Sequence, residues 1–262
     1  MIIVGELINS TRSKVKEAIK EKNEEYIRKL VRLQVSQRAN FLDVNSAMSL
    51  KSEVEDLKWL VGIIQSETDI PLSIDTPAID AMEEGLKLCR TPPMINSITN
   101  EKKREILIKL AKDYNAHVIA LPLGGKKKMP VNLQERMEEA KELLSELDKG
   151  GIDRNKIYLD VLIIGVGSNP EAGKIALQTL REYKKEFPSV KTIAGLSNIS
   201  FGLPYRRLLN RTFLVMMIES GLDAVIIDPA DEDLIDTMKT AMVLTGRDKY
   251  CREYIKYMKG KK

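Results

Sequence analysis

Carboxylate and carboxamide side chains recur where short apolar runs of this sequence end. Seven of eight such runs carry one: Glu6 and Asn9, Asp43 and Asn45, Asp75, Asn96 with Ser97, Asp160, Asn198 with Ser197, and Asp228. A carboxylate inside an apolar strand costs several kcal/mol unless it is satisfied. Any one of these residues could cap a helix or pair with a neighbour, but that explanation does not account for the whole set.

These residue types favour a neutral heterocycle as the ligand. An ionised Asp accepts two N–H bonds from an aminopyrimidine edge, and Asn donates and accepts at once. A hard cation such as Mg²⁺ is the alternative. Because the carboxylates come from runs spread along the whole chain, a compact metal cluster is disfavoured, and we expect no tightly bound metal.

The scarcity of histidine and cysteine excludes several other chemistries. His117 is the one histidine, and Cys89 and Cys251 are the two cysteines, so four ligands for a structural zinc site are not available. His117 opens the run HVIALPL, and we expect it partly buried at the start of a strand, away from any site. The sequence contains no glycine-rich phosphate motif of the G-x-x-x-x-G-K-[ST] type.

The elements that position the polar residues alternate in type from one end of the chain to the other. Strands are predicted at 2–8, 41–45, 71–75, 94–98, 117–123, 157–163, 192–198 and 224–228, because these runs are apolar on both faces. Helices are predicted at 24–38, 52–67, 101–114, 131–151, 170–187, 205–220 and 232–244. Ser52, with Glu55 three residues later, has the spacing of a capping box.

Alternation of strand and helix predicts parallel strands joined by right-handed crossovers. With eight strands in 262 residues, a closed (β/α)₈ TIM barrel is favoured over an open doubly wound sheet. No linker or internal repeat divides the chain, so residues 1–262 are expected to form a single domain. In such barrels the reacting groups lie at the C-terminal ends of the strands, which would gather the polar residues on one rim.

Composition narrows the class of protein further. Hydrophobic residues make up 43% and charged residues 31%, and the net charge of +4 is spread along the chain, so a basic stripe for nucleic acid is not predicted. No apolar run approaches the roughly 20 residues that span a bilayer, and no signal peptide is visible. Two cysteines in a chain of this size suggest a reducing compartment, and we expect a cytoplasmic protein.

Longer motifs carry a family resemblance. The segments GELINSTRSKVKEAI, LDVNSA, LSIDT, PMINSIT, IYLDVLI, GLSNISFGLPYRRLLNRTFL and GLDAVIIDP together resemble the methyltetrahydrofolate:corrinoid-protein methyltransferases. These are pterin-binding barrels related to the folate module of cobalamin-dependent methionine synthase. The resemblance runs from Met1 to about Tyr257. It implies a homodimer that moves a methyl group between N5 of tetrahydrofolate and the cobalt of a corrinoid carried on another protein.

The resemblance also implies roles for individual residues. The pterin-binding residues fall on Asp75, Asn96 and Asp160. The asparagine of the seventh strand, which is implied to reach N5 of the folate, falls on Asn198, and it is the expected catalytic residue. The neighbouring substrate-binding positions are Gly195, Ser197 and Arg206, with Arg207 as the competitor of Arg206. Three further residues of the polar rim are expected to support them: Glu6, Asp43 and Asn45.

The chain departs from one branch of the family and matches another. Relatives of the acetyl-CoA pathway read GERIN and N-V-S-Q, whereas this chain reads GELIN and N-I-S-F-G-L-P. The second pattern resembles methionine synthase and the methyltransferases of O-demethylase or methylamine/betaine systems. The resemblance therefore implies the second methyltransferase component of such a system, which uses tetrahydrofolate or 5-methyltetrahydrofolate as substrate.

The partner is implied to bring the corrinoid (cobalamin) to the barrel. Corrinoid modules offer a histidine to cobalt from a D-x-H-x-x-G motif, which is not found around His117. The corrinoid protein is therefore expected to dock over the C-terminal rim. Lys126, Lys127 and Lys128 lie in the predicted loop after strand five, where they either form a solvated charge run or attract an acidic partner or the glutamate tail of folate.

Two alternatives stay open at this point. Dihydropteroate synthase shares the barrel and the pterin pocket, but its basic G-x-S-R-K segment would fall at GLSN, which holds no lysine or arginine. A non-catalytic folate-binding subunit of a corrinoid complex would bind the pterin without transferring methyl groups.

Overall fold

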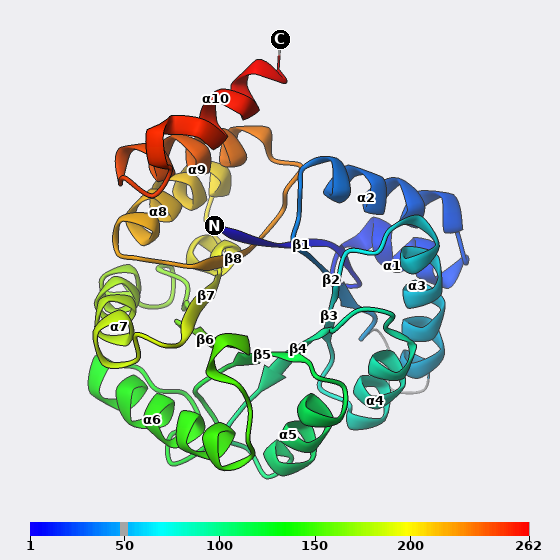
Figure 1. Cartoon of the computed structure of the whole chain (residues 1–262), viewed down its shortest axis with the longest axis horizontal. Coiled ribbons are helices and arrows are strands. Elements are labelled where there is room, and N and C mark those ends of the chain that lie inside the picture. The colour runs from blue at the N-terminus through cyan, green and yellow to red at the C-terminus, as the bar shows by residue number, and fades with distance from the viewer. Residues whose placement is uncertain (48–51, 262) are drawn as a thin grey trace.

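A closed barrel of parallel strands forms the centre of the molecule (Figure 1). The computed structural model describes residues 1–47 and 52–261. Within these ranges the strands follow one another around the barrel in sequence order, as the alternation of elements predicts. They are β1 (Ile2–Asn9), β2 (Phe41–Asn45), β3 (Leu72–Asp75), β4 (Met94–Ile98), β5 (His117–Ala120), β6 (Ile157–Asp160), β7 (Lys191–Gly195) and β8 (Ala224–Ile227).

Helices surround the barrel, and each crossover between consecutive strands contains at least one (Figure 1). The α-helices are α1 (Ser13–Lys20), α2 (Glu24–Ser36), α3 (Glu53–Glu67), α4 (Ile79–Leu88), α5 (Arg104–Asp113), α6 (Leu133–Lys149), α7 (Ala172–Glu186), α8 (Arg206–Glu219), α9 (Glu232–Leu244) and α10 (Arg252–Lys259). Short 3₁₀-helices are η1 (Arg154–Lys156), η2 (Leu196–Ser200) and η3 (Lys249–Cys251). None of the helices in the described ranges is long and apolar enough to cross a membrane.

Helix α6 illustrates how local sequence sets these elements. Asn132 caps its start by accepting a hydrogen bond from the Glu135 backbone N–H (3.0 Å). Leu143 and Leu147 are buried one turn apart on the face that covers the barrel. The helix ends at Lys149 with Gly150 as its C-cap, and Gly151 follows with a φ of 79°, a left-handed conformation that favours glycine.

Two apolar cores hold the barrel. The larger one fills the layer between the strands and the helices. The smaller one plugs the barrel interior with side chains from seven strands: Val4, Phe41, Met94, Ile119, Tyr158, Ile193 and Ala224. Most of these residues lie in the first half of their strands, so the plug closes the N-terminal end and leaves the C-terminal end for polar groups.

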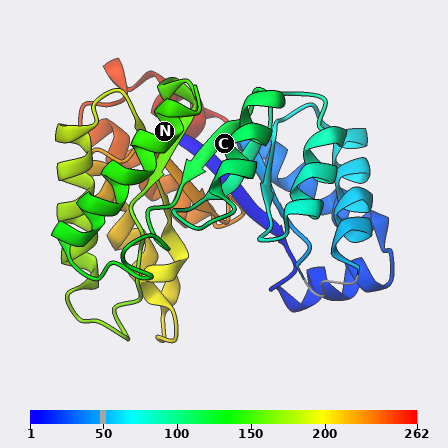
Figure 2. The same ribbon diagram turned by 90° about the horizontal axis from the view of Figure 1, so that it is seen from below.

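The two ends of the barrel are distinct in side view. The N-terminus lies toward the upper end in Figure 2, whereas the blue segment after β1 and the yellow segment after β7 extend at the lower end. Because these segments follow strand C-termini, the lower end of that view is the rim where the sequence predicts the reacting groups.

Several predicted boundaries are wrong. Strand β5 ends at Ala120, two residues before Pro122, which has no N–H for the sheet. Strand β6 ends at Asp160 because the chain turns at Leu162, which has a φ of 55°. Strand β7 ends at Gly195, where η2 begins. The capping box is also absent, since the side chain of Ser52 makes no capping hydrogen bond to α3.

Candidate active site at the C-terminal rim

The sequence-predicted residues do gather at the C-terminal ends of the strands. Glu6 lies in the second half of β1, Asp43 and Asn45 in β2, Asp75 at the end of β3, Asn96 in β4, Asp160 at the end of β6 and Gly195 at the end of β7. Ser197 and Asn198 lie in η2, and Arg206 begins α8. Since all strands are parallel, these positions share one rim.

A hydrogen-bond network links β2, β3 and β4. Asp43 Oδ1 accepts from Ser73 Oγ (2.7 Å) and from Asn96 Nδ2 (3.1 Å). Asn45 Nδ2 donates to Asp75 Oδ2 (3.0 Å). Strand register creates the network, because Asp43 pairs with Ser73 and Asp75 pairs with Asn96. The side chains are therefore fixed before any ligand arrives.

The same bonds determine which ligand atoms the site can accept. Asp43 takes up the amide donor of Asn96, and Asn45 occupies one oxygen of Asp75. Among the described residues, no side chain or backbone N–H bonds Asp75 Oδ1 or Asn96 Oδ1. Both are acceptors, so the wall formed by β3 and β4 suits a ligand edge that carries N–H donors.

Burial changes the protonation of the rim carboxyls. It raises the pKa of Asp75, and it raises the pKa of Asp43 well above the ordinary range, with the nearby Asp75 charge adding to the effect. Burial also raises the pKa of Asp160 to about 6 and that of Glu6 to about 7. The rim therefore holds acids that can carry a proton near neutral pH.

A tight turn after β6 orients Asp160. Its Oδ1 accepts a hydrogen bond from the Leu162 backbone N–H (2.6 Å), which lowers the pKa of Asp160 against the larger effect of burial. Leu162 has the left-handed conformation already noted, which is uncommon for a bulky residue. The turn thus fixes the carboxylate at the point where the strand ends.

The loop after β7 presents Asn198. Its side chain is exposed, and a Cβ at Gly195 would lie 3.3 Å from Asn198 Nδ2, so glycine allows the amide to lie close to the strand end. Arg206 braces the loop, since its guanidinium donates to the Ser197 carbonyl (2.8 Å) and to Ser200 Oγ (3.1 Å). Arg207 instead pairs with Asp231 at 3.7 Å and is largely exposed.

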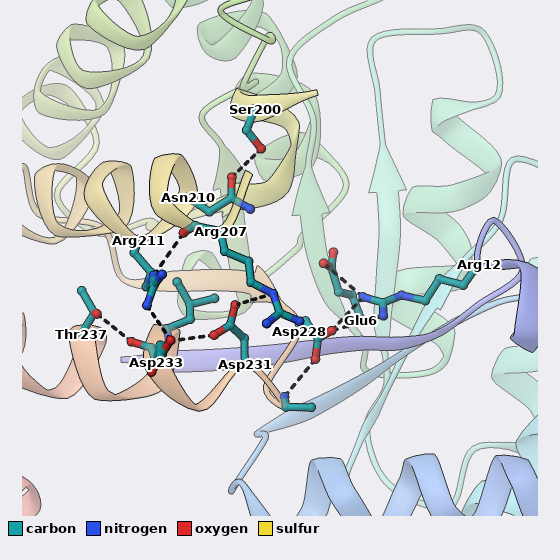
Figure 3. Close-up of polar contacts among 12 residues, drawn as sticks. Glu6, Arg12, Ser200, Arg207, Asn210, Arg211, Asp228, Asp231, Asp233 and Thr237 are labelled. Atoms are coloured by element: carbon teal, nitrogen blue, oxygen red, sulfur yellow. Dashed lines mark hydrogen bonds and ion pairs between the residues drawn. The ribbon is translucent and has the colours of Figure 1, made fainter. Parts of the chain in front are cut away.

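A cavity of about 640 Å³ opens between this loop and the ends of β1 and β8. Glu6, Asn198, Arg206 and Arg207 line it, together with residues that the sequence analysis did not select as binding residues: Asn9, Thr11, Arg12, Asn210, Asp228 and Asp231. Figure 3 shows Arg12 between Glu6 and Asp228, at 3.8 Å and 3.2 Å. Asp75, Asn96 and Asp160 do not line this cavity.

Arg12 is one of the cavity residues that sequence reasoning missed. It joins two predicted rim residues, Glu6 and Asp228, which are far apart in sequence. A signal was present, because Arg12 lies just beyond the end of β1, close in sequence to the rim residues Glu6 and Asn9. A buried carboxylate is stabilised by a cation close to it, so a basic residue near this rim is a candidate member of the site.

Other residues singled out in the sequence lie away from the site. His117 begins β5, is half-buried, and stacks edge-on against Phe41 and Tyr158 of the interior plug. Both cysteines are unpaired and half-buried. No group of three or more His, Cys, Asp or Glu side chains within residues 1–47 and 52–261 has an arrangement that could hold a metal ion.

The sequence of this chain is similar to those of known proteins. Residues 5–228 match the family described as pterin binding enzyme. The chain is 31% identical to the methylcorrinoid:tetrahydrofolate methyltransferase of Eubacterium limosum, over 98% of this chain and 95% of the relative. It is 28% identical to methionine synthase of Mycobacterium leprae over 87% of this chain, which corresponds to 20% of that larger protein.

A solved structure shares the fold at low sequence identity. The dihydropteroate synthase of Clostridium difficile, determined in the presence of pteroic acid, superposes with a TM-score of 0.73 over 93% of this chain and 96% of that chain, at 22% identity. The family match extends over most of the chain and includes every strand from the second half of β1 to β8. This chain belongs to the pterin binding enzyme family.

Proposed function

We propose that the chain is a methyltransferase that moves a methyl group between N5 of tetrahydrofolate and the cobalt of a corrinoid carried on a separate protein. The observation that carries the proposal is the 31% identity, along nearly the whole chain, to a protein named methylcorrinoid:tetrahydrofolate methyltransferase. Dihydropteroate synthase is supported only by likeness of fold at 22% identity. The polar rim supplies the chemistry that the proposal needs.

The pterin is proposed to bind at the wall formed by β3, β4 and β6. Asp75 and Asn96 offer acceptor oxygens whose positions are fixed by Asn45 and Asp43. Asp160 adds a third carboxyl at the end of β6. A pterin edge carries both amino and ring N–H donors, so these acceptors would orient it in one way.

Asn198 is proposed to act at N5. An amine nitrogen does not leave as an anion, so N5 needs a proton or a strong hydrogen bond while its bond to the methyl group breaks. The Asn198 amide is exposed at the cavity, and no described residue bonds its side chain. A hydrogen bond that strengthens in the transition state accelerates the reaction more than it tightens binding.

A protonated acid is also available at the same cavity. Burial raises the pKa of Glu6 to about 7, although Arg12 opposes this effect. Glu6 and Asn198 line the same cavity, so a proton can be held close to the proposed N5 position at neutral pH. We therefore infer that Glu6 assists Asn198 by holding a proton near N5.

The corrinoid is proposed to remain on the partner protein. Its cobalt exchanges the methyl group, whereas this chain binds and orients the folate. His117, the one histidine, lies at the closed N-terminal end of the barrel, so it does not offer cobalt a ligand at the rim. Phe201 and Tyr205, 74% and 86% exposed in the segment between Asn198 and α8, give the rim an apolar surface suited to docking a protein.

A homodimer is proposed through the outer face of α8. This helix is apolar on its inner face and also exposes four large apolar side chains: Leu208, Leu209, Val215 and Met216. An adjoining groove of about 500 Å³ runs between α7 and α8. An apolar outer surface of this extent favours a second copy of the chain.

The unpaired cysteines support the prediction of a cytoplasmic location.

A methyl-transfer assay tests the function. Tetrahydrofolate and methylcobalamin are mixed with the protein, and the loss of methyl–cobalt absorbance is followed, with the reverse reaction run in parallel. We expect Asn198→Ala to lower turnover about 10²- to 10³-fold, as for other preorganised donors, while folate affinity changes only a few-fold. Asn155→Ala, in the exposed η1, is the matched control and should behave as the wild type.

Two results would contradict the proposal. Equal losses of turnover and folate affinity in Asn198→Ala would remove its role at N5. Tight folate binding without turnover, even with corrinoid proteins added, would identify a non-catalytic folate-binding subunit.

A further inference from the structure

A fully buried arginine lies behind the rim, on a helix that the proposed reaction does not use. Arg136 of α6 has no exposed surface. Its Nη1 donates to the Val161 carbonyl (3.0 Å), and neither Nε nor Nη2 has a hydrogen-bond partner among the described residues. A guanidinium is among the most costly groups to bury, so its place in the interior needs a reason beyond filling space.

The contacts of Arg136 lead directly to the site. Val161, whose carbonyl it holds, follows Asp160 in the chain, and the next residue is Leu162 in its left-handed conformation. The Asp160 carboxylate holds the other side of the same turn through the Leu162 N–H. Arg136 and Asp160 therefore both hold the turn formed by residues 160–162.

The groups around Arg136 show that its charge interacts with Asp160. Burial lowers the pKa of Arg136, whereas Tyr183 and Asp160, among the described residues, raise it. Burial raises the pKa of Asp160, and among the described residues the charge of Arg136 opposes that rise. The Tyr183 hydroxyl donates to the Arg136 carbonyl (3.3 Å), which ties α7 to this part of α6.

We propose that Arg136 is a positioning residue for pterin binding, which holds the turn after β6 and places a positive charge behind Asp160 so that this residue meets the pterin as a carboxylate. The proposal rests on the proposed function and adds to it a residue that touches no substrate. It assigns to α6 the electrostatic support of a group on the barrel rim.

Folate binding as a function of pH tests the proposal. Arg136→Met removes the charge and keeps an unbranched apolar chain, so the pKa of Asp160 should rise further. If binding needs the carboxylate, the affinity for 5-methyltetrahydrofolate at pH 6 should fall about fivefold for a rise of one unit and about fiftyfold for a rise of two, and return to within about twofold of the wild type near pH 8.5. Arg136→Lys keeps the charge and should keep the wild-type pH profile.

Two further variants make the result decisive. Arg136→Gln keeps an N–H donor for Val161 without the charge, and it carries the test if the Met variant does not fold. Arg104→Met removes a largely buried arginine of α5 that also has an unpartnered Nε but bonds Asn100, so it should leave the pH profile unmoved. The titration of the Asp160 carboxyl in folate-free protein, followed by NMR, gives a readout that needs no ligand.

The outcomes separate this inference from the proposed function. A wild type that binds no folate contradicts the function, whereas the NMR titration still tests the action of Arg136 on Asp160. A Met or Gln variant that loses affinity equally at all pH values, with the titration of Asp160 unchanged, shows a merely structural arginine and overturns the proposal. A shifted titration together with recovery of binding at high pH supports it.

Discussion

Replacing Asp160 by Asn should stabilise the protein at neutral pH while impairing folate binding. The folded protein holds the Asp160 proton with a pKa of about 6, against 3.8 for the ordinary side chain. A carboxyl whose pKa is raised by folding contributes stability below its unfolded pKa, and that contribution is lost as the pH rises through the folded pKa. Asn resembles the protonated acid but does not titrate, so the Asp160→Asn variant should keep this contribution to stability as the pH rises.

The size of the effect follows from the two pKa values. A difference of roughly two units corresponds to about 3 kcal/mol in the free energy of unfolding, and about half of this falls between pH 5 and pH 8. The Asn side chain can still accept the Leu162 N–H, so the turn should survive. We therefore expect the stability difference between variant and wild type to grow by about 1.5 kcal/mol across this range.

Urea unfolding at half-unit pH steps from 5 to 8 measures this difference directly. Other titrating groups, Glu6 included, are present in both proteins and cancel in the subtraction. Asp69→Asn, at an exposed position without hydrogen bonds or ion pairs among the described residues, is the control and should give a flat difference. A flat difference for Asp160→Asn as well would refute the view that this carboxyl is desolvated behind the rim.

Two further predictions concern α6 and α8. Glu139→Ala removes the acceptor of hydrogen bonds from Asn100 Nδ2 (2.7 Å), Gly125 N (3.2 Å) and Lys127 N (2.8 Å). It should therefore lower the free energy of unfolding by at least about 3 kcal/mol and speed tryptic cleavage of the loop after β5. Urea unfolding and timed proteolysis measure these effects, and an unchanged cleavage rate would contradict the prediction. Met216→Glu places a charge on the exposed face of α8 and should shift the proposed dimer to monomer in sedimentation, whereas a monomeric wild type would contradict the dimer itself.

The fold and most of the rim could be predicted because both depend on local pattern. Strands covered on two sides are apolar throughout, so a carboxylate such as Asp43 or Asp75 within one is conspicuous. The topology then brings such residues to one rim without any knowledge of side-chain contacts. Strand ends were less predictable. The apolar runs in the sequence extend to residues 163 and 198, whereas β6 ends before the turn at Leu162 and β7 ends at Gly195, before η2.

The division of the rim was not predictable from the sequence. The large cavity contains Asn198 and Glu6 but not Asp75 or Asp160, which lie on other strands of the same rim. Which residues share a cavity depends on the loops after β1, β7 and β8 and on ion pairs such as that between Arg12 and Asp228. Such pairs join residues distant in sequence, and composition alone cannot identify the partners.

Arg136 shows a signal that sequence reading can use. In α6, the buried positions Ala140, Leu143 and Leu147 lie four, seven and eleven residues after Arg136, which is the spacing of one helix face. An arginine at the first position of that apolar face does not lie on the solvent side. Burying its charge is costly, so such an arginine indicates a polar group in the interior that it stabilises. Glu139 is buried one turn further along and holds the loops after β4 and β5, as Arg136 holds the turn after β6. One helix thus orders three consecutive loops of the rim with two buried charges. The order of the site therefore depends on α6 as much as on the strands that carry its side chains.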